Sequence, residues 1–490
     1  MRTPRRVLVL FLATLILGGC AAVGPDYTPP TLAASQIPAN FGTVPPGLDM
    51  RTVEVAWWQA FDDPALTSLI ERALAANHDI GMAAARVEEA RALAGEARQG
   101  FLPRGAVVLG HENRRRSDVE LMPGQPRRTE TYRGAVDASW EVDLFGRIRR
   151  SVEAAEALAG SRAALLRGVQ AGIAASVAAT WFELQGIDAE LAVVVEISAS
   201  QRDSLGLVER LLQAGAATEF DRLRAEALLR DAEAVVPELK RRRAASVNAL
   251  AVLLGEAPQT FRAPPATPAR ETLSLRTIAI GDPVALMTRR ADVAAAERDL
   301  AAATARIGIE TAGLYPDVQV EGSIGLVAGS LDAISGRAVS GLLAPVLRWS
   351  FLDSGRVRAR IAASEARGRE ALIAYEQTVL RALQEADDAF EAYGAAGRTL
   401  ELRLSESAAN REVARLARAR FSAGEGIYLD VLEAERSDFA SRRALVAART
   451  QQRLAVVSIH KALGGGWEAC AQAGLDCSGA SGTPSWRAPN

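Results

Sequence analysis

The sequence predicts an α+β membrane protein: a tandem-duplicated chain that forms a trimeric 12-stranded transmembrane β-barrel, continued by a long α-helical coiled-coil barrel. Three observations predict this fold class. One repeat recurs at a nearly constant offset along the 490 residues, strands of alternating polarity precede each long helix, and each long helix contains no proline before its first break.

The first residues resemble a secretory signal peptide that ends in a lipidation site. Arginines among the first six residues precede an apolar run over residues 7–17, which is the order of features in a signal peptide. The run ends in the letters LGGC, which resemble the lipobox of bacterial lipoproteins. This resemblance implies cleavage before Cys20 and a diacylglyceryl lipid on its thiol, and Ala21 in place of Asp favours outer-membrane retention. The alternative is a free cysteine in an ordinary signal peptide.

Composition excludes several classes of function. The 57 Lys and Arg residues nearly balance the 59 Asp and Glu residues, for a net charge of −2, so no nucleic-acid partner is expected. The three histidines are far apart and make no metal-spaced set, and we expect no cofactor apart from the lipid on Cys20. The sequence shows no nucleophile–base constellation or phosphate loop, so we do not expect an enzyme.

Internal repeats show that the chain is a tandem duplication. The segment that begins at Asn77 lines up with the segment that begins at Arg290, an offset of 213. The second copy then has a shorter insert, and the offset falls to 209, at which Trp140 meets Trp349. One offset that holds from residue 140 to residue 464 is hard to obtain by chance.

The repeat sets the predicted domain boundaries. Each copy is expected to contain a helix, two strands joined by a loop, and a long helix that turns and returns. Along the chain the predicted segments are a signal peptide (1–19), a lipidated N-terminal segment (20–62), the first repeat (63–255), an inter-repeat linker (256–282), the second repeat (283–464) and a flexible C-terminal tail (465–490). Cys470 and Cys477 in the tail could close a small disulfide loop in an oxidising periplasm, and the sequence leaves this open.

Each copy has strands that alternate apolar and polar residues. The pattern is plain over residues 131–141 and 317–327, and less clean over the partner strands 104–114 and 338–348. Such alternation is typical of a transmembrane β-barrel, with a half-buried soluble sheet as the alternative. Because four strands cannot close a barrel and a membrane tolerates no open sheet edge, strands from several subunits must join, and a trimer supplies twelve.

The long helices carry a regular apolar seam. Between Trp140 and Gly215 no proline occurs, which allows roughly 100 Å of helix at 1.5 Å per residue. Apolar residues recur about every 3.5 residues, which indicates supercoiled packing against neighbouring helices. The seam residues are Leu166, Val169, Ile173, Val177, Trp181, Leu184, Ile187, Leu191 and Val194.

The joints between strands and long helices share one pattern of residues. Asp143 in the first copy and Asp353 in the second precede a glycine and an arginine. We expect each aspartate to complement the N-terminus of its helix. The glycines, Gly146 and Gly355, are expected to let the backbone turn sharply.

Each long helix breaks at an Ala-Gly pair, at Gly215 in the first copy and at Gly424 in the second. Glycine supplies the backbone conformation that such a turn needs. In the first copy Thr218 and Asp221 predict a capping box for the returning helix. The second copy has an isoleucine in place of that threonine, so Gly426 is expected to start the helix and this tip to be the less tightly capped one.

A set of ordered motifs resembles those of a known family. The motifs are VGPDY from residue 23, WWQAF from 57, SWEVDLFGR from 139, LAVLLG from 250, RRADV from 289, LYP from 314 and LRWSF from 347. Over about residues 20–465 the chain resembles the TolC-like outer-membrane efflux proteins, in particular the lipoprotein (NodT-type) branch that serves multidrug pumps. Ala291 departs from the family, which usually has proline there.

The resemblance implies a homotrimer with its barrel in the outer membrane and a helical tunnel that extends into the periplasm. It implies a passive duct for drugs or other small molecules, docked to a periplasmic membrane-fusion adaptor and an inner-membrane transporter of the RND type. The alternatives are a duct for protein secretion and a structural coiled-coil lipoprotein. The exported compounds cannot be read from the sequence.

The resemblance also implies a periplasmic gate at the second-copy tip. Its residues fall on Leu429, Glu433 and Arg436, whose i, i+4 and i+7 spacing independently puts them on one helix face. In a trimer they form an apolar ring above a ring of carboxylates, although the family more often has Asp at the glutamate position. The alternatives are a surface ion pair between Glu433 and Arg436 and ordinary seam packing for Leu429. The residues expected to face the adaptor at the two tips are Gly215, Thr218, Asp221, Gly424, Gly426 and Tyr428.

Overall fold

The computed structural model describes residues 22–30, 38, 40–42, 44–49, 51, 56–265 and 278–465. Cys20, Cys470 and Cys477 lie outside these residues, and so do the predicted lipid anchor and disulfide. The chain divides into two compact units. The first unit holds the described residues 22–30, 87–162 and 295–376, and the second holds those of 32–86, 163–294 and 377–465.

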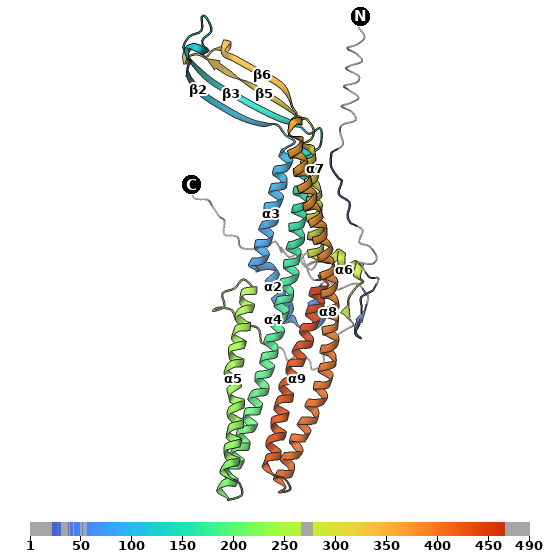
Figure 1. Cartoon of the computed structure of the whole chain (residues 1–490). Helices are drawn as coiled ribbons and strands as arrows, with labels where there is room; N and C mark the ends of the chain where they lie inside the picture. The colour runs from blue at the N-terminus through green and yellow to red at the C-terminus, as the bar shows by residue number, and fades with distance from the viewer. Residues whose placement is uncertain are drawn as a thin grey trace. The chain divides into compact units, whose positions relative to one another are not determined.

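The first unit contains a four-stranded antiparallel sheet in the order β2-β3-β5-β6 (Figure 1). Its strands are β2 (Arg104–Arg115), β3 (Arg128–Val142), β5 (Asp317–Ala328) and β6 (Val339–Arg348). All four predicted strands are therefore confirmed. The first copy supplies β2 and β3, the second supplies β5 and β6, and the two copies pair in the middle of the sheet through β3 and β5.

The register places apolar residues on one face of the sheet and mostly polar residues on the other. Val136 lies opposite Val107 on β2 and Ile324 on β5. The next residue, Asp137, points to the other face, where the Ser323 hydroxyl donates a 2.6 Å hydrogen bond to its carboxylate. Along the strands the apolar face carries Val107, Leu109, Val136, Trp140, Val318, Val320, Ile324, Leu326, Leu343 and Leu347. Most of these side chains are exposed, which is unlike a half-buried soluble sheet.

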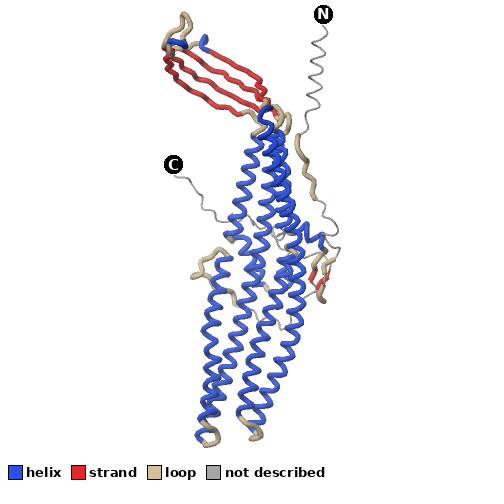
Figure 2. Tube along the Cα trace, viewed as in Figure 1, coloured by secondary structure: helices blue, strands red, loops and turns tan. Residues whose placement is uncertain are grey.

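Helices make up the rest of both copies (Figure 2). They are α2 (Pro64–Ala76), α3 (His78–Gln99), α4 (Arg147–Gln213), α5 (Glu219–Leu253), α6 (Pro283–Arg289), α7 (Ala291–Ala312), α8 (Ser354–Ser422) and α9 (Tyr428–Ala462). The prediction of one helix before each strand pair is wrong, because each copy has two. In the first copy the break is at Asn77, whose side-chain oxygen accepts hydrogen bonds from the backbone N–H groups of Asp79 (2.9 Å) and Ile80 (3.2 Å). These bonds satisfy the N-terminus of α3 and stop α2.

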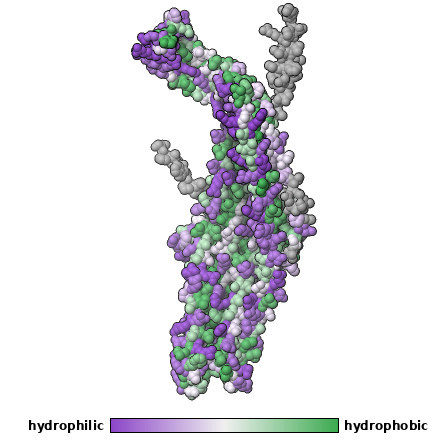
Figure 3. Space-filling view, viewed as in Figure 1, coloured by the Kyte–Doolittle hydropathy of each residue, from purple (hydrophilic) through white to green (hydrophobic). Residues whose placement is uncertain are grey.

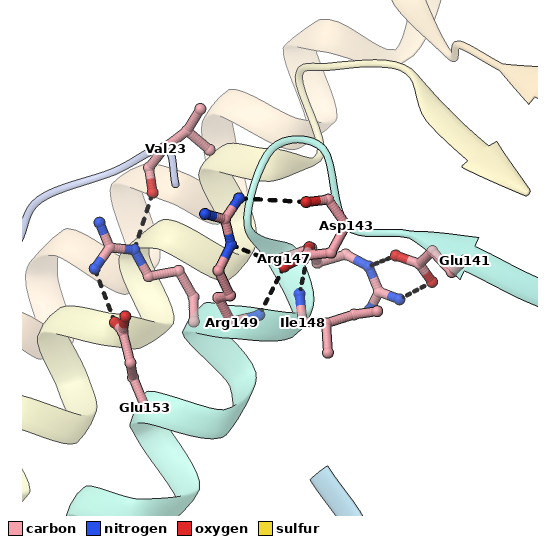
Figure 4. A network of polar contacts seen from close by, with 8 residues as sticks. Val23, Glu141, Asp143, Arg147, Ile148, Arg149 and Glu153 are labelled. Carbon is pink, nitrogen blue, oxygen red and sulfur yellow. Dashed lines mark hydrogen bonds and ion pairs between the residues drawn. The ribbon is translucent and has the colours of Figure 1, made fainter. Parts of the chain in front are cut away.

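The joint between β3 and α4 forms as predicted (Figure 4). The Asp143 carboxylate accepts hydrogen bonds of 2.9 and 3.0 Å from two backbone N–H groups in the first turn of α4. These donors have no partner within the helix, so the carboxylate caps it. Gly146 has a φ of +79°, and a Cβ there would lie 2.4 Å from the Cβ of Ala22. The position therefore requires glycine for both its backbone conformation and its close contact.

The corresponding joint in the second copy is built differently, and the prediction of a sharp turn at Gly355 is wrong. Asp353 ends a short 3₁₀ turn, and Gly355 lies inside α8 without a positive φ. The tryptophans of the two joints nevertheless make equivalent hydrogen bonds. The indole N–H of Trp140 (2.9 Å) and that of Trp349 (3.1 Å) each donate to a backbone carbonyl just before the first strand of their own copy.

The core of the second unit forms around the seam of α4. Of the predicted seam residues, Ile173, Val177, Trp181, Leu184, Ile187 and Val194 are buried, and Leu166, Val169 and Leu191 pack against them. Trp57 and Trp58 are buried in the same core, and Trp57 stacks on His460 with ring centres 4.9 Å apart. The seam prediction is confirmed. A two-stranded parallel sheet of β1 (Leu48–Asp49) and β4 (Ile278–Ala279), in the same unit, was not predicted.

Candidate gate at the hairpin tips

In the second unit α4 and α5 form one antiparallel hairpin, and α8 and α9 form another (Figure 1). Each hairpin turns at its predicted glycine, Gly215 with a φ of +73° and Gly424 with a φ of +77°. In both turns the backbone N–H of the glycine bonds to a carbonyl three residues earlier, and the next N–H bonds to one five residues earlier. A Cβ at either glycine would touch nothing within 4 Å. Backbone conformation alone therefore requires glycine at both tips.

The first tip carries the predicted capping box. The Asp221 backbone N–H donates to the Thr218 hydroxyl (3.2 Å), and the Thr218 backbone N–H donates to the Asp221 carboxylate (3.0 Å). The Thr218 hydroxyl also donates to that carboxylate at 2.6 Å. These bonds, the side-chain one first, hold the pKa of Asp221 below its usual 3.8. The start of α5 is thus stabilised within four residues of chain.

The second tip lacks such a cap. Ile427 is the N-cap residue of α9, and it makes no side-chain hydrogen bond to the helix. The prediction that Gly426 starts the helix is wrong, because Ile427 follows it in an extended conformation and α9 begins at Tyr428. The prediction of a less tightly capped second tip is correct for the local hydrogen bonds.

Packing holds the second tip instead. Tyr428, Val431 and Leu432 are buried in a cluster with Val208 of α4 and Ala225 of α5. Burial raises the pKa of the Tyr428 hydroxyl, and the charges of Glu435 and Asp221 add to this effect. The structure therefore places Tyr428 in the interior of the tip, and not among the exposed residues that an adaptor would meet.

The three predicted gate residues lie on a neighbouring face of α9, roughly a third of a turn around the helix from this cluster. Leu429 is half-buried, and Glu433 and Arg436 are exposed. In the part of the chain that the structure describes, Glu433 and Arg436 form no ion pair with each other or with another residue. The alternative of a surface pair between them is not observed. Their charges are available to groups beyond this single chain.

Glu435 is a functional candidate that sequence analysis missed. Its side chain is only 3% exposed, yet it carries a carboxylate. The carboxylate accepts hydrogen bonds from Gln201 (3.0 Å) and Ser204 (3.3 Å) of α4 and from the Arg418 guanidinium (2.6 Å) of α8. The available signal was its spacing, since Glu435 continues the buried stripe of Leu432 and Phe439 on α9.

The Glu435 contacts fix α9 against both hairpins. Gln201 and Ser204 belong to the first hairpin, whereas Arg418 belongs to the second and also donates to Ser200 of α4 at 2.9 Å. Positions 433 and 435 are two residues apart, which is about 200° around a helix. Holding Glu435 inward therefore turns Glu433 outward. Glu435, which sequence analysis missed, therefore fixes the orientation of the predicted gate residue Glu433.

Comparison with protein-family models gives one result for this chain. The model described as outer membrane efflux protein matches residues 69–256 and 283–465. Among curated proteins, the chain is 30% identical over 474 residues to outer membrane protein OprJ of Pseudomonas aeruginosa, covering 96% of this chain and 97% of that protein. It is 32% identical over 468 residues to the solvent efflux pump outer membrane protein SrpC of Pseudomonas putida, covering 93% and 97%.

Solved structures of outer-membrane channels have the same fold. The outer-membrane channel OprN superposes with a TM-score of 0.85 at 33% identity, covering 91% of this chain and all of that chain. The MtrE channel of Neisseria gonorrhoeae, described in its open state, superposes with a TM-score of 0.82 at 26% identity, covering 91% and 99%.

Proposed function

Because the chain belongs to the outer membrane efflux protein family, we propose that three copies form the outer-membrane duct of a tripartite efflux system. The family comprises outer-membrane channels and not enzymes, so the chain is a transport protein of the outer membrane. The duct conducts passively, and its direction and energy come from a pump in the inner membrane.

The exposed apolar face of the sheet carries this proposal. A sheet with one apolar face open on all four strands fits a surface that faces lipid. Its edge strands β2 and β6 can pair with the β6 and β2 of neighbouring copies, which removes every open edge. Three copies supply twelve strands, and the mostly polar face then lines a water-filled lumen.

The second tip supports a gate in the assembled trimer. Leu429, Glu433 and Arg436 share one face of α9, on which Leu429 is half-buried and the other two are exposed, so three copies form stacked rings of leucine, carboxylate and guanidinium groups. A narrow apolar ring excludes water, and a carboxylate ring favours cations. Opening requires α9 to move outward against contacts made between hairpins.

The two tips and the N-terminal segment support the expected partners. Phe220 at the first tip and Ile427 at the second are large apolar residues that stay exposed, at 65% and 61%, as a docking surface for a periplasmic adaptor would require. The pump beyond it is an inner-membrane transporter of the RND type, and the lipid on Cys20 adds a second attachment to the membrane. Relatives named for solvent and antibiotic efflux favour drugs and other small molecules as cargo.

Two measurements test the proposal. Cells that lack this chain should accumulate a fluorescent dye, and wild-type protein should restore its clearance. In a planar bilayer the purified protein should form pores that prefer cations, and Glu433→Ala should lower that preference severalfold and raise the open fraction. The matched control is Glu412→Ala, which removes an exposed carboxylate that pairs with Arg415 on α8. Absence of pores from the wild type would overturn the duct, whereas equal selectivity of Glu433→Ala and wild type would overturn the gate.

A further inference from the structure

An apolar hollow lies on the lipid-facing side of the sheet, beside the loop that joins β5 to β6. Its volume is about 510 Å³. Gly110, Gly134 and Arg133, which pairs with Asp137, border the hollow. It is lined mainly by Leu109, His111, Tyr132, Leu326, Leu331 and Ile334. The first four of these belong to the apolar face by their register, and the last two come from the loop. Hydrocarbon is the natural occupant of such a lining.

Two arginines lie opposite each other on the same face, nearer the ends of the strands. Arg115 of β2 pairs in register with Arg128 of β3, and both side chains are exposed. Like charges directly across a strand pair destabilise it unless an anion lies between them. Among the described residues neither arginine has an ion-pair partner, whereas the adjacent Arg114 pairs with Glu112 and Arg127 pairs with Asp118. The pair is therefore a site for an anionic group with several oxygens, such as a phosphate.

Polar groups occupy the face between the hollow and the two arginines. The His111 and Tyr132 rings lie 4.5 Å apart, and beyond them the Asn113 amide donates to the Glu130 carboxylate at 3.3 Å. Four residues separate His111 from Arg115, which is roughly 13 Å along a strand. A ligand that fills both ends therefore has a polar spacer between its hydrocarbon and its phosphate.

The polar side chains beside this spacer discriminate between two classes of lipid, phospholipids and glycolipids. In a phospholipid the phosphate follows the acyl esters closely, which would place it beside the Glu130 carboxylate, where like charges repel. A sugar hydroxyl can instead donate to Glu130 and accept from Asn113. The loops at residues 116–127 and 329–338 are at the end of the sheet away from the helices, and that end is largely hydrophilic in Figure 3. In the proposed duct, this end of the sheet faces the outer leaflet.

From this arrangement we propose that each subunit binds a phosphorylated, acylated glycolipid of the outer leaflet. An acyl chain fills the hollow, the sugar contacts Asn113 and Glu130, and a phosphate bridges Arg115 and Arg128. The inference rests on the proposed function, since it requires the apolar face to meet lipid. It adds a ligand to the outside of the duct, and the contact ties the loop end of the sheet to the outer leaflet.

Native mass spectrometry of the full-length protein in detergent tests the site. The probes are a hexa-acylated disaccharide bisphosphate, its dephosphorylated form, phosphatidylglycerol and inorganic phosphate. We expect the wild type to bind the bisphosphate at least tenfold more tightly than the other three probes. The double variant Arg115→Gln with Arg128→Gln should lose that preference, and Ile334→Asp should weaken both glycolipids alike. Arg114→Gln is the matched control, because Arg114 points to the opposite face of the sheet.

Three results would overturn the glycolipid site. One is phosphatidylglycerol binding as tightly as the bisphosphate, which would indicate a phospholipid. Another is an equal loss in Arg114→Gln, which would indicate diffuse surface charge. The last is binding that does not depend on the phosphates. Pore formation by the same preparations keeps the two proposals apart: pores without glycolipid preference overturn only the site, whereas absence of pores overturns the duct.

Discussion

The two hairpin tips have the same turn but are stabilised by different means. Gly215 and Gly424 adopt nearly the same φ and make equivalent backbone hydrogen bonds. After the turn, the first tip is held by the Thr218–Asp221 box and leaves Phe220 exposed. The second has no cap and is held by buried residues of α9 and by the Glu435 contacts.

The start of α5 is thus stabilised by its own residues, whereas the start of α9 depends on contacts with other helices. A capping box needs only its own four residues, so this part of the first tip's stability does not depend on neighbouring helices. The second tip is ordered by α4 and α8, so its stability changes when those helices shift. A gate needs a dependent element of this kind, because movement elsewhere must reach it. The duplicated chain has thus kept one turn and diverged in what stabilises it.

Among the variants that test this difference between the tips, Glu435→Ala should have the largest effect on local stability. It removes hydrogen bonds to one charged group from Gln201, Ser204 and Arg418, and such bonds contribute about 1.5–3 kcal/mol each when a buried partner is left unpaired. Because Arg418 is half exposed and can be solvated, and because the desolvation cost of the buried carboxylate offsets much of the sum of these bonds, we expect a net loss of about 2 kcal/mol in the local opening free energy of residues 427–440. Hydrogen exchange measured by mass spectrometry gives this value directly.

The control for Glu435→Ala is the exposed Glu412–Arg415 pair on α8, and Glu412→Ala should change exchange by little. The first tip, residues 214–225, should keep its protection in both variants. Equal loss of protection at the two tips would show that the second tip is not separately dependent on Glu435. In bilayers Glu435→Ala should raise the open fraction while keeping the cation preference, because Glu433 is still present.

Gly215→Ala and Gly424→Ala should have the next largest effect, and should affect the two tips equally. An L-residue in the left-handed conformation costs about 1–2 kcal/mol, and neither position adds a steric clash to that cost. The measurement is the local opening free energy of each hairpin by hydrogen exchange. Clearly unequal losses would mean that the turns differ in more than their caps.

Substitutions of the two N-cap residues should change the local opening free energy by about 1 kcal/mol at each tip. Thr218→Val should weaken the start of α5 by this amount. Ile427→Thr should strengthen the start of α9, because Asp430 already stands three residues later, as Asp221 does after Thr218. The gain should appear as slower exchange at residues 428–432 and a lower open fraction in bilayers. If the new threonine gives no protection, packing and not the missing cap limits the second tip.

Local pattern and repetition predicted most of the fold. The strand ranges, the α4 seam, both glycine turns and the Thr218 box follow from periodicity and capping rules that act within a few residues. The rules failed where the same local motif adopts two different conformations. Gly355 follows an aspartate as Gly146 does, yet a short 3₁₀ turn at Phe351–Asp353 leaves it inside the helix.

The candidate site was predicted less completely, because burial depends on contacts distant in sequence. The positions of Leu429, Glu433 and Arg436 on one face of α9 follow from helical spacing. The burial of Tyr428 does not, since it depends on Val208 and Ala225 of the other hairpin. Besides the nearby Arg418, Glu435 needs Gln201 and Ser204, which are more than 200 residues away, and a single sequence gives no sign of that distant pair.

The smallest expected effect is a pH dependence confined to the first tip. The pKa of Asp221 is depressed in the folded chain, so its contribution to stability is present above its usual value of 3.8 and is lost as pH falls through the folded value. Asp221 is partly exposed, so screening by solvent keeps this contribution small. Exchange at residues 218–225, corrected for intrinsic rates, should therefore quicken slightly between pH 4.5 and pH 3. Asp221→Asn should abolish the change, and the start of α9, where the N-cap is Ile427, should show none. An equal acid response at both tips would mean that it arises from the packing that they share and not from the cap that only one of them has.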